Sequence, residues 1–482
     1  MALMTAEQYK DSLRDGRTVY YRGARVQDVT THPVIGIAVE HATIDYQMAH
    51  DSEESDLAVV DGPKGAYSRY YQIPRTADDL LCRSALIERA TALGGTLVVL
   101  IKEIGTDALF SLHLIAAEMD RVKGTNYLPR VKKYYAYCRD NDLAVAVAQT
   151  DAKGNRAKGP TEQRHPDFYV HVVAEDNDGI TLRGAKVHTS VSTNAHEIIV
   201  LPTRNLKAGE EAYAVACAVP ANTPGLTMLA SGYGSRTGKT FENPISARHK
   251  MMETLTVFED VKVPWDRVFL NGEIDMAGPL AKAFVEFHRF TAVSYKLPLV
   301  DVFVGTSHLM ADYNGTLGAG HVRDKLAKLI SYAQICRGMT REAARECAIV
   351  DGIAVPNAEI INIAKFYFAT NYHQALAWVQ DIAGGLLVTG PSAEDLESLT
   401  LRPLIDRYLG AAGASATDRL RLMNLIAEIT TTDFGGYQAV LAVHAEGSVE
   451  AEKMTIWRQH DITPSVAYAK RLAGITDEEA PD

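Results

Sequence analysis

The spacing of apolar residues changes twice along the chain, and this change constrains the fold more than any single motif. Within residues 1–142 apolar side chains mostly recur every three or four positions, as on one face of a helix. Within 143–274 they alternate, as in half-buried strands, and within 275–482 the helical spacing returns in long runs. We therefore predict an α+β protein with an N-terminal helical domain, a middle β-barrel or β-sandwich and a C-terminal helix bundle.

Several elements can be placed inside these domains. Residues 168–173 are expected to form a strand that turns at 177–179 and returns through 180–182. In the third domain, 326–350 and 362–382 are rich in Ala, Leu and Ile and are predicted as long bundle helices.

Composition excludes several classes of function. With 482 residues, 47% of them hydrophobic and 23% charged, the chain is typical of a multidomain globular protein. The net charge of −11 argues against non-specific binding of nucleic acid, which needs a basic surface. No signal peptide or membrane span is expected, and the five scattered cysteines form no CxxC pair. We expect reduced thiols in a cytoplasmic protein.

A glycine pair, Gly384-Gly385, interrupts the apolar run near residue 380 and is followed by Pro391-Ser392. Glycine commonly ends helices, so a helix cap is one interpretation. The other is a turn whose backbone N–H groups approach a phosphate, because no Cβ stands in the way. Both interpretations stay open at this point.

Several segments, in order, resemble one known family. They are Arg17–Gly23, Val26–Pro33, Pro74–Thr76, Asn141–Leu143, Gly184–Thr189, His288-Arg289 and Ala311–Gly315, together with the glycine pair. On these segments the chain is similar to the 4-hydroxyphenylacetate 3-hydroxylase family, which also contains the 4-hydroxybutyryl-CoA dehydratases. The resemblance covers nearly the whole chain and implies an acyl-CoA dehydrogenase-like fold, consistent with the order of the three domains.

The resemblance also implies an FAD site, completed by neighbouring subunits of a homotetramer. The residues that it assigns to the cofactor lie in three segments: Gln149, Thr150, Asp151, Lys153, Asn155 and Arg156; Thr189 and Ser190; and Asp381, Gly384, Gly385, Pro391 and Ser392. Amide groups and a threonine hydroxyl suit the polar edge of a flavin, and Arg156 can offset phosphate charge.

At the reaction centre the chain departs from both branches of the family. The dehydratases hold an iron–sulfur cluster with three cysteines and a histidine; the histidine matches His288, but the cysteine positions are Val99, Glu103 and Tyr295. These side chains cannot replace thiolates, so we predict no cluster and no metal site. A tyrosine of that branch is Ala292 here. The phenol-binding histidine, arginine and tyrosine of the hydroxylases fall on Val147, Ile104 and Ala108.

Other ionisable residues are therefore candidates for the chemistry. We predict Glu253, His288 and Arg289 as catalytic residues, with Glu103, Lys102 and Tyr295 as further candidates. Two alternatives stay open: His288 is a hydrogen-bonded core residue, or Glu253 only pairs with a neighbouring base such as Lys250 or Arg248.

The leading functional hypothesis is a two-component monooxygenase. It would take reduced FAD from a separate reductase and use O₂ to oxygenate an aromatic or related organic substrate. The chain has no Gly-x-Gly-x-x-Gly fingerprint after a strand, as expected if NAD(P)H is oxidised by another protein. The alternatives are a cluster-free, FAD-dependent acyl-CoA dehydratase or isomerase and a non-catalytic binding protein.

Overall fold

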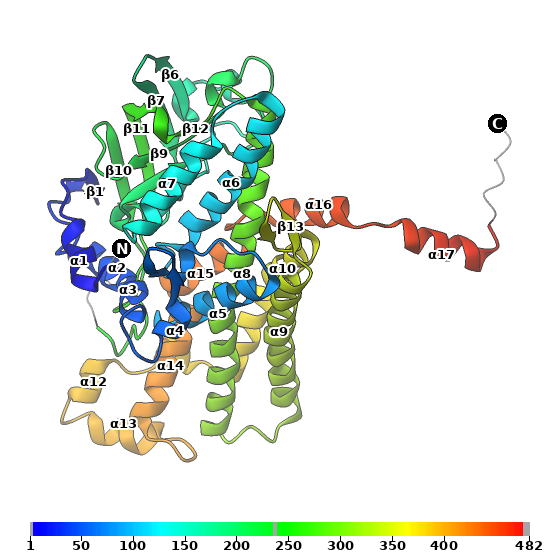
Figure 1. Cartoon of the computed structure of the whole chain (residues 1–482). Helices are drawn as coiled ribbons and strands as arrows, with labels where there is room; N and C mark the ends of the chain where they lie inside the picture. The colour runs from blue at the N-terminus through cyan, green and yellow to red at the C-terminus, as the bar shows by residue number, and fades with distance from the viewer. Residues whose placement is uncertain (1–2, 235–238, 476–482) are drawn as a thin grey trace.

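The computed structural model describes residues 3–234 and 239–475 (Figure 1). A region of two β-sheets occupies one end of the body, and a bundle of long helices occupies the other. The N-terminal helices pack alongside both; near the C-terminus helix Val449–Gln459 packs against helix Ala358–Ala383 of the bundle, and only the last helix projects away from the body. The main hydrophobic core runs through helices and sheets alike, and a small second cluster consists of Leu396, Ile405, Ala416 and Leu420.

The N-terminal segment is mostly helical and also contains short strands. Its elements are α1 (Ala6–Ser12), β1 (Val19–Tyr21), β2 (Ala24–Arg25), α2 (Ile35–Ala42), α3 (Ile44–Met48), α4 (Ser55–Ala58), β3 (Val59–Gly62), β4 (Gly65–Ser68), α5 (Ala77–Leu93), α6 (Glu103–Lys123) and α7 (Leu128–Asp140). Helix α5 begins with a capping box, in which Thr76 and Asp79 each accept a hydrogen bond from the other's backbone N–H.

The strands of the middle segment form the two larger sheets. They are β5 (Val145–Ala148), β6 (His171–Glu175), β7 (Gly179–Lys186), β8 (Glu197–Val200), β9 (Val215–Pro220), β10 (Leu226–Ser231), β11 (Glu253–Pro264) and β12 (Val268–Asn271). The six-stranded sheet has the order β2-β1-β10-β11-β7-β6, and the four-stranded sheet has the order β12-β9-β8-β5. Strand β1 pairs with β10 in parallel, so the N-terminal segment extends the sheet of the middle one.

The C-terminal segment is almost entirely helical. Its elements are α8 (Ile274–Tyr313), α9 (Gly320–Arg345), β13 (Ala348–Val350), β14 (Ile353–Val355), α10 (Ala358–Ala383), α11 (Leu386–Thr389), α12 (Ala393–Glu397), α13 (Arg402–Leu409), α14 (Ala416–Thr430), α15 (Asp433–His444), α16 (Val449–Gln459) and α17 (Thr463–Ala473). Helices α8, α9 and α10 lie side by side as the main bundle (Figure 1).

Two sequence predictions need correction. The helix expected over 326–350 is α9, which ends at Arg345; residues 348–350 instead form a β-hairpin with 353–355, turning at Asp351 and Gly352, which both have positive φ. The strand expected over 168–173 begins only at His171, because Pro166 starts a 3₁₀ turn that ends at Phe168. The hairpin return and the helix over 362–382 are confirmed.

A close contact sets the position of helix α6 against the four-stranded sheet. A Cβ on Gly105 would lie 2.4 Å from the Cβ of Val145 on strand β5, so only glycine permits this approach. The contact brings the first turn of α6, with its polar residues, to the junction of sheet and bundle.

Candidate functional site

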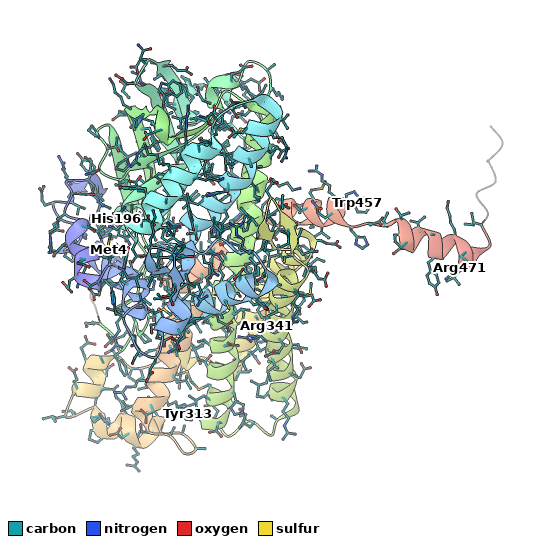
Figure 2. The ribbon with its side chains drawn as sticks, in the orientation of Figure 1. Met4, His196, Tyr313, Arg341, Trp457 and Arg471 are labelled. Carbon is teal, nitrogen blue, oxygen red and sulfur yellow. The ribbon has the colours of Figure 1, made fainter. Side chains whose placement is uncertain are left out.

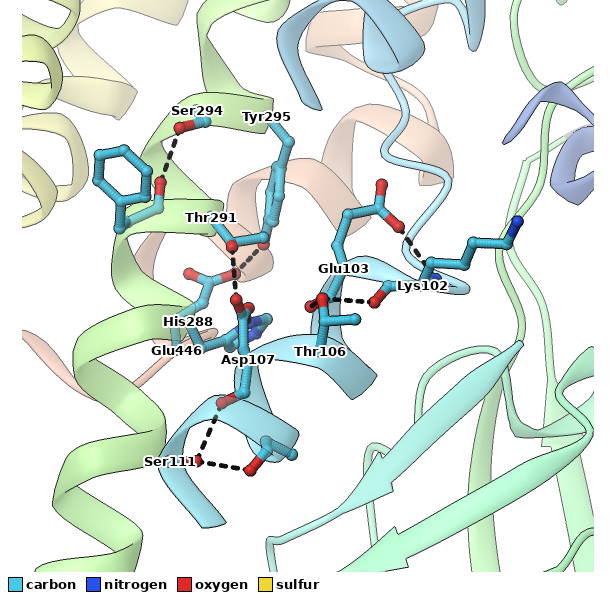
Figure 3. A network of polar contacts seen from close by, with 12 residues as sticks. Lys102, Glu103, Thr106, Asp107, Ser111, His288, Thr291, Ser294, Tyr295 and Glu446 are labelled. Carbon is cyan, nitrogen blue, oxygen red and sulfur yellow. Dashed lines mark hydrogen bonds and ion pairs between the residues drawn. The ribbon is translucent and has the colours of Figure 1, made fainter. Parts of the chain in front are cut away.

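Helix α8 carries a row of polar side chains through an otherwise apolar core. His288, Thr291 and Tyr295 follow one another at three- and four-residue spacing and therefore lie on one face of the helix. Figure 3 shows this face turned toward Asp107 of α6 and Glu446, the residue two positions after the end of α15. The junction of these elements is the candidate site.

The Asp107 network consists of Arg83, Asp107, His288 and Thr291. Asp107 is fully buried; its Oδ1 accepts hydrogen bonds from Arg83 at 2.8 Å and Thr291 at 3.0 Å, and its Oδ2 lies 3.1 Å from His288 Nδ1. Phe284 stacks on the imidazole with ring centroids 5.2 Å apart. His288 is thus held at a fixed orientation from two sides, and its Nε2 is the ring atom that remains for other contacts.

The Glu446 network consists of Tyr295, Lys296, Lys365 and Glu446. Tyr295 Oη donates a hydrogen bond to Glu446, Lys296 Nζ bonds its other oxygen at 2.9 Å, and Lys365 Nζ lies 3.7 Å away. Burial alone would raise the pKa of Glu446, but Lys296 and Lys365 lower it to about 2. Burial lowers the pKa of Lys296 to about 8, despite the attraction of Glu446. The network therefore holds a permanent carboxylate beside an ammonium that titrates near neutral pH.

Arg289 fixes the segment that carries Glu446. Its Nε donates to the Glu446 carbonyl at 3.1 Å, and a Cβ on Gly447 would lie 2.6 Å from the Arg289 guanidinium. Glu446 and Gly447 both have positive φ, 60° and 109°. Arg289, predicted as catalytic, thus contacts the backbone of this turn.

The Glu253 group consists of Ser190, Glu253 and Tyr437. Ser190 Oγ donates to both carboxylate oxygens of Glu253 at 2.9 and 3.0 Å, and Tyr437 Oη donates to Oε1 at 2.6 Å. Tyr233 stacks on Tyr437 with ring centroids 3.6 Å apart. Burial raises the pKa of Glu253, opposed by its two hydroxyl donors and reinforced by Glu446. Glu253 thus has hydroxyl partners, while Lys250, one of the bases weighed as its partner, donates to the Tyr233 carbonyl.

The other candidates are placed differently. Lys102 is fully buried and its ammonium bonds Asp142 at 2.6 Å, on the side away from His288 (Figure 3). Glu103 is also buried, accepts a hydrogen bond from the backbone N–H of Lys102, and has its pKa raised by burial. Lys102 therefore forms an ion pair with Asp142 in the core, and Glu103 lies at the start of α6 beside the Asp107 network.

The side chains at the positions where the resemblance places the cluster ligands do not fit an iron–sulfur cluster. Val99 is buried as an apolar residue, Tyr295 donates to Glu446, and His288 is held by Asp107. Among residues 3–234 and 239–475, no group of three or more His, Cys, Asp or Glu side chains could hold a metal ion.

The loops after strands β5 and β7 offer features that suit a flavin. Thr189 Oγ1 is buried and has no hydrogen-bond partner in the described part of the chain. Nearby, burial lowers the pKa of His188, and Lys153 and Arg156 lower it further. A buried hydroxyl without a partner and a positive field fit the polar edge and phosphates of FAD.

Some of the predicted flavin residues have structural partners within the chain. Asp151 forms a buried ion pair with Lys186 at 2.7 Å, and Gln149 accepts from Lys186 through its carbonyl. The Asn155 side chain accepts from the Ala157 backbone in an exposed turn. These residues shape the loop, and Ser190 likewise has a partner within the chain, Glu253.

The glycine pair lies elsewhere. Gly384 has φ 82° and ends α10 as its C-cap, and the neighbouring Asp381 pairs with Lys325 near the start of α9. Helix α10 has 26 residues, so it is ~39 Å long, and Gly384 lies at its end away from the sheets (Figure 1). A Cβ on Gly384 or Gly385 would meet nothing within 4 Å. Pro391 and Ser392 follow on the same surface, where Ser392 caps α12. One chain therefore does not bring this segment to Thr189.

The sequence did not single out Asp107, Lys296, Lys365 or Tyr437. Asp107 and His288 are 181 residues apart, and Tyr437 and Glu253 are 184 apart, so spacing could not reveal these pairs. The available signal was a charged side chain, such as Lys296, on a helix face that is otherwise apolar.

Comparison with known proteins places the chain in a family. Residues 5–270 match the family described as 4-hydroxyphenylacetate 3-hydroxylase N terminal, and residues 277–474 match its C-terminal counterpart. The chain belongs to the 4-hydroxyphenylacetate 3-hydroxylase family.

Its relatives have two different activities in their names. A 4-hydroxybutyryl-CoA dehydratase/vinylacetyl-CoA-Delta-isomerase of Clostridium aminobutyricum is 31% identical over 98% of this chain and 100% of its own length. A 4-hydroxyphenylacetate 3-monooxygenase oxygenase component of Thermus thermophilus is 28% identical over 98% of this chain and 97% of its own length.

Solved structures show the same division. The 4-hydroxybutyryl-CoA dehydratase of N. maritimus matches with a TM-score of 0.92 at 29% identity, over 100% of this chain and 97% of that one. The oxygenase component (HpaB) of 4-hydroxyphenylacetate 3-monooxygenase, complexed with FAD, matches with a TM-score of 0.89 at 26% identity, over 98% of both chains. The fold and the family are therefore shared with enzymes of both kinds.

Proposed function

We propose that this protein is an FADH₂-dependent monooxygenase that receives reduced FAD from a separate reductase and oxygenates an aromatic or related organic substrate. The observation that carries the proposal is the Glu446 network, in which Tyr295 stands where the resemblance places a cluster cysteine and Lys296 lies beside it. A phenol, an ammonium and a carboxylate there handle protons and do not fit iron and sulfide.

The chain's own residues would hold the cofactor in two parts. Thr189 and the loop carrying Thr150 would bind the flavin ring, while Lys153 and Arg156 would offset phosphate charge. The segment from Gly384 to Ser392 would come from a neighbouring subunit of a homotetramer. When bound, reduced FAD would supply the electrons for reaction with O₂.

Glu253, the stacked tyrosines and His288 have distinct tasks in this proposal. Glu253, whose pKa is raised by burial, is a stronger base than an exposed carboxylate and would take a proton from a substrate hydroxyl. The stacked Tyr233 and Tyr437 offer a flat aromatic wall to a substrate ring. His288, oriented by Asp107, would donate or accept a hydrogen bond through Nε2.

The test is single turnover of the FAD-loaded protein, reduced anaerobically and mixed with oxygenated buffer containing a panel of phenols and aromatic acids. We expect oxygenated product in at least one case and a yield that falls in Tyr295→Phe. Tyr71→Phe is the matched control, because it also removes a buried phenol's hydrogen bond, here to the Leu143 carbonyl. Release of hydrogen peroxide alone, with every substrate, would contradict the proposal.

A second candidate function is a cluster-free, FAD-dependent acyl-CoA dehydratase or isomerase. It is favoured by the 31% identity to the Clostridium enzyme and by two interacting carboxylates, Glu253 and Glu446, the second of which also interacts with His288. Under this alternative, protein loaded with oxidised FAD exchanges hydrogens of a short acyl-CoA with deuterated water, without reductant or O₂. Exchange that disappears in Glu253→Gln would select it over the monooxygenase.

A further inference from the structure

Three buried side chains next to Arg83 carry oxygen atoms that lack hydrogen-bond partners. They are Asp45 of α3, Tyr70 and Glu103, which are 3%, 2% and 0% exposed. In the part of the chain that the structure describes, both carboxylate oxygens of Asp45, the Tyr70 hydroxyl and Glu103 Oε1 have no partner. Buried polar atoms are nearly always bonded, so this group, the Asp45 cluster, calls for an explanation.

The electrostatics of the three residues show that they lie against one another. Burial raises the pKa of Asp45 well above its usual range, and the charge of Glu103 raises it further. Burial also raises the pKa of Tyr70, and Asp45 and Glu103 both add to the rise. The phenol therefore faces two carboxyl groups at once.

The two cations nearest to the Asp45 cluster already serve other carboxylates. Lys102 bonds Asp142 at 2.6 Å, and Arg83 bonds Asp107 at 2.8 Å. The second oxygen of Asp142 accepts from the backbone N–H of Met4, at the N-terminal edge of the body (Figure 2). The cluster thus has two carboxyl groups and no cation of its own. The other titratable groups that interact with Asp45 are the phenols Tyr9 and Tyr46.

The two carboxyl groups of the cluster differ in their surroundings. Glu103 Oε2 accepts the backbone N–H of Lys102 at 3.2 Å, and the charge of Arg83 opposes the rise that burial causes in the Glu103 pKa. Asp45 has no donor at either oxygen among the described residues. Two buried carboxylates without a cation of their own do not both stay ionised, and Asp45 is the one that ionises less readily.

Arg83 connects the Asp45 cluster to the candidate site. Its Nη1 donates to the Tyr70 carbonyl at 3.1 Å, and its Nη2 donates to the Glu103 carbonyl at 2.9 Å and to Asp107 Oδ1 at 2.8 Å. On the far side, Asp107 lies 3.1 Å from the imidazole of His288 (Figure 3). The guanidinium therefore stands between the cluster and the carboxylate that orients His288.

We propose that Asp45 and Glu103 together hold one proton at neutral pH, with Asp45 as the neutral acid, and that this proton keeps the charge of Arg83 on Asp107. When the proton passes to solvent at higher pH, two carboxylates compete with Asp107 for the guanidinium. Asp45 is thus a positioning residue that acts on His288 through Arg83 and Asp107. The inference concerns the charge beside the site and does not depend on which reaction the site performs.

The first experiment looks for the proton by infrared spectroscopy of the full chain. A protonated carboxylic acid has its own carbonyl stretch, which shifts in deuterated water, and the difference from Asp45→Asn assigns it. Glu428→Gln is the matched control, since it neutralises a buried carboxylate whose oxygens accept the N–H groups of Ile245 and Ser246. At neutral pH we expect Asp45→Asn to remove one such band and Glu428→Gln to remove none. If Asp45→Asn removes no band, the proton is not there and the proposal is overturned.

The sharing of the proton and the link to Arg83 are tested by the pH at which this band disappears. We expect a pH lower by about one unit in Glu103→Gln, because the charge that retains the proton is gone. We expect a similar decrease in Asp107→Asn, because Arg83 is then free to compensate an ionised pair. Circular dichroism identifies the conditions in which each variant is folded. An unchanged pH in Glu103→Gln overturns the sharing, and an unchanged pH in Asp107→Asn overturns the link to the site.

Discussion

The Asp107 network and the Glu446 network are built from similar groups but differ in how they are held. Both place a buried carboxylate among a cation and a hydroxyl on neighbouring helices. Asp107 stands inside α6 and is bonded from α5 and α8, whereas Glu446 stands in a turn of positive φ between α15 and α16. From this difference we propose that the Asp107 network fixes geometry and that the Glu446 network handles protons.

The largest expected effect comes from a substitution that breaks the Asp107 network. Asp107→Asn leaves the buried Arg83 guanidinium without its carboxylate, so we expect a loss of about 3–5 kcal/mol in the free energy of unfolding. Urea denaturation followed by circular dichroism measures it. Glu446→Gln is the comparison: Lys296, with a pKa of about 8, can lose its proton instead, so a smaller loss is expected. Equal losses of unfolding free energy in the two variants would contradict the proposed difference between the networks.

For turnover we expect the reverse: substitutions in the Glu446 network should lower kcat more than they lower stability. Tyr295→Phe keeps the ring and removes the hydroxyl that bonds Glu446, so we expect about a hundredfold lower kcat with stability nearly unchanged. Measuring kcat and unfolding on the same preparation separates the two effects. If the variant loses kcat only because a matching fraction of the protein is unfolded, Tyr295 has a structural role alone.

The pH dependence sharpens the contrast further. The folded pKa of Lys296, about 8, lies below its usual 10.5, so charging this group costs stability at low pH and the cost fades as pH rises from 8 toward 10.5. If the charged form supports the site, kcat/KM falls about tenfold per pH unit above 8. Lys296→Arg, which stays charged, should remove the fall. A fall that persists in this variant assigns the titration to another group.

The smallest expected effect concerns the cofactor. Thr189→Val removes the buried hydroxyl that lacks a partner in the described structure, so FAD should bind about fivefold more weakly, a loss of about 1 kcal/mol. Thr189→Ser keeps the hydroxyl and is expected to bind normally. Fluorescence titration with FAD measures both. Equal affinity in Thr189→Val and the unchanged protein would remove Thr189 from the cofactor site.

Periodicity indicates helices and strands because it reports which faces of the chain are buried. It missed the end of α9 because Ala348 to Val350 continue an apolar run, and only the turn at Gly352 shows that the run is a hairpin. At the site, resemblance to the family indicated Glu253, His288 and Tyr295. It could not indicate Asp107 or Tyr437, because their roles depend on contacts between distant segments.

The glycine pair illustrates the same limit. Gly384 is a helix cap in the structure, and its proposed contact with a flavin requires a second chain. A sequence shows that glycine permits a close approach but not which molecule approaches.

The most direct test of the central claim is isotopic. Protein loaded with reduced FAD is mixed with isotopically labelled O₂ and an aromatic substrate, and the product is analysed by mass spectrometry. The proposed monooxygenase places one labelled oxygen atom in the product. Labelled hydrogen peroxide as the sole product, together with deuterium exchange into an acyl-CoA by the protein carrying oxidised FAD, would contradict it.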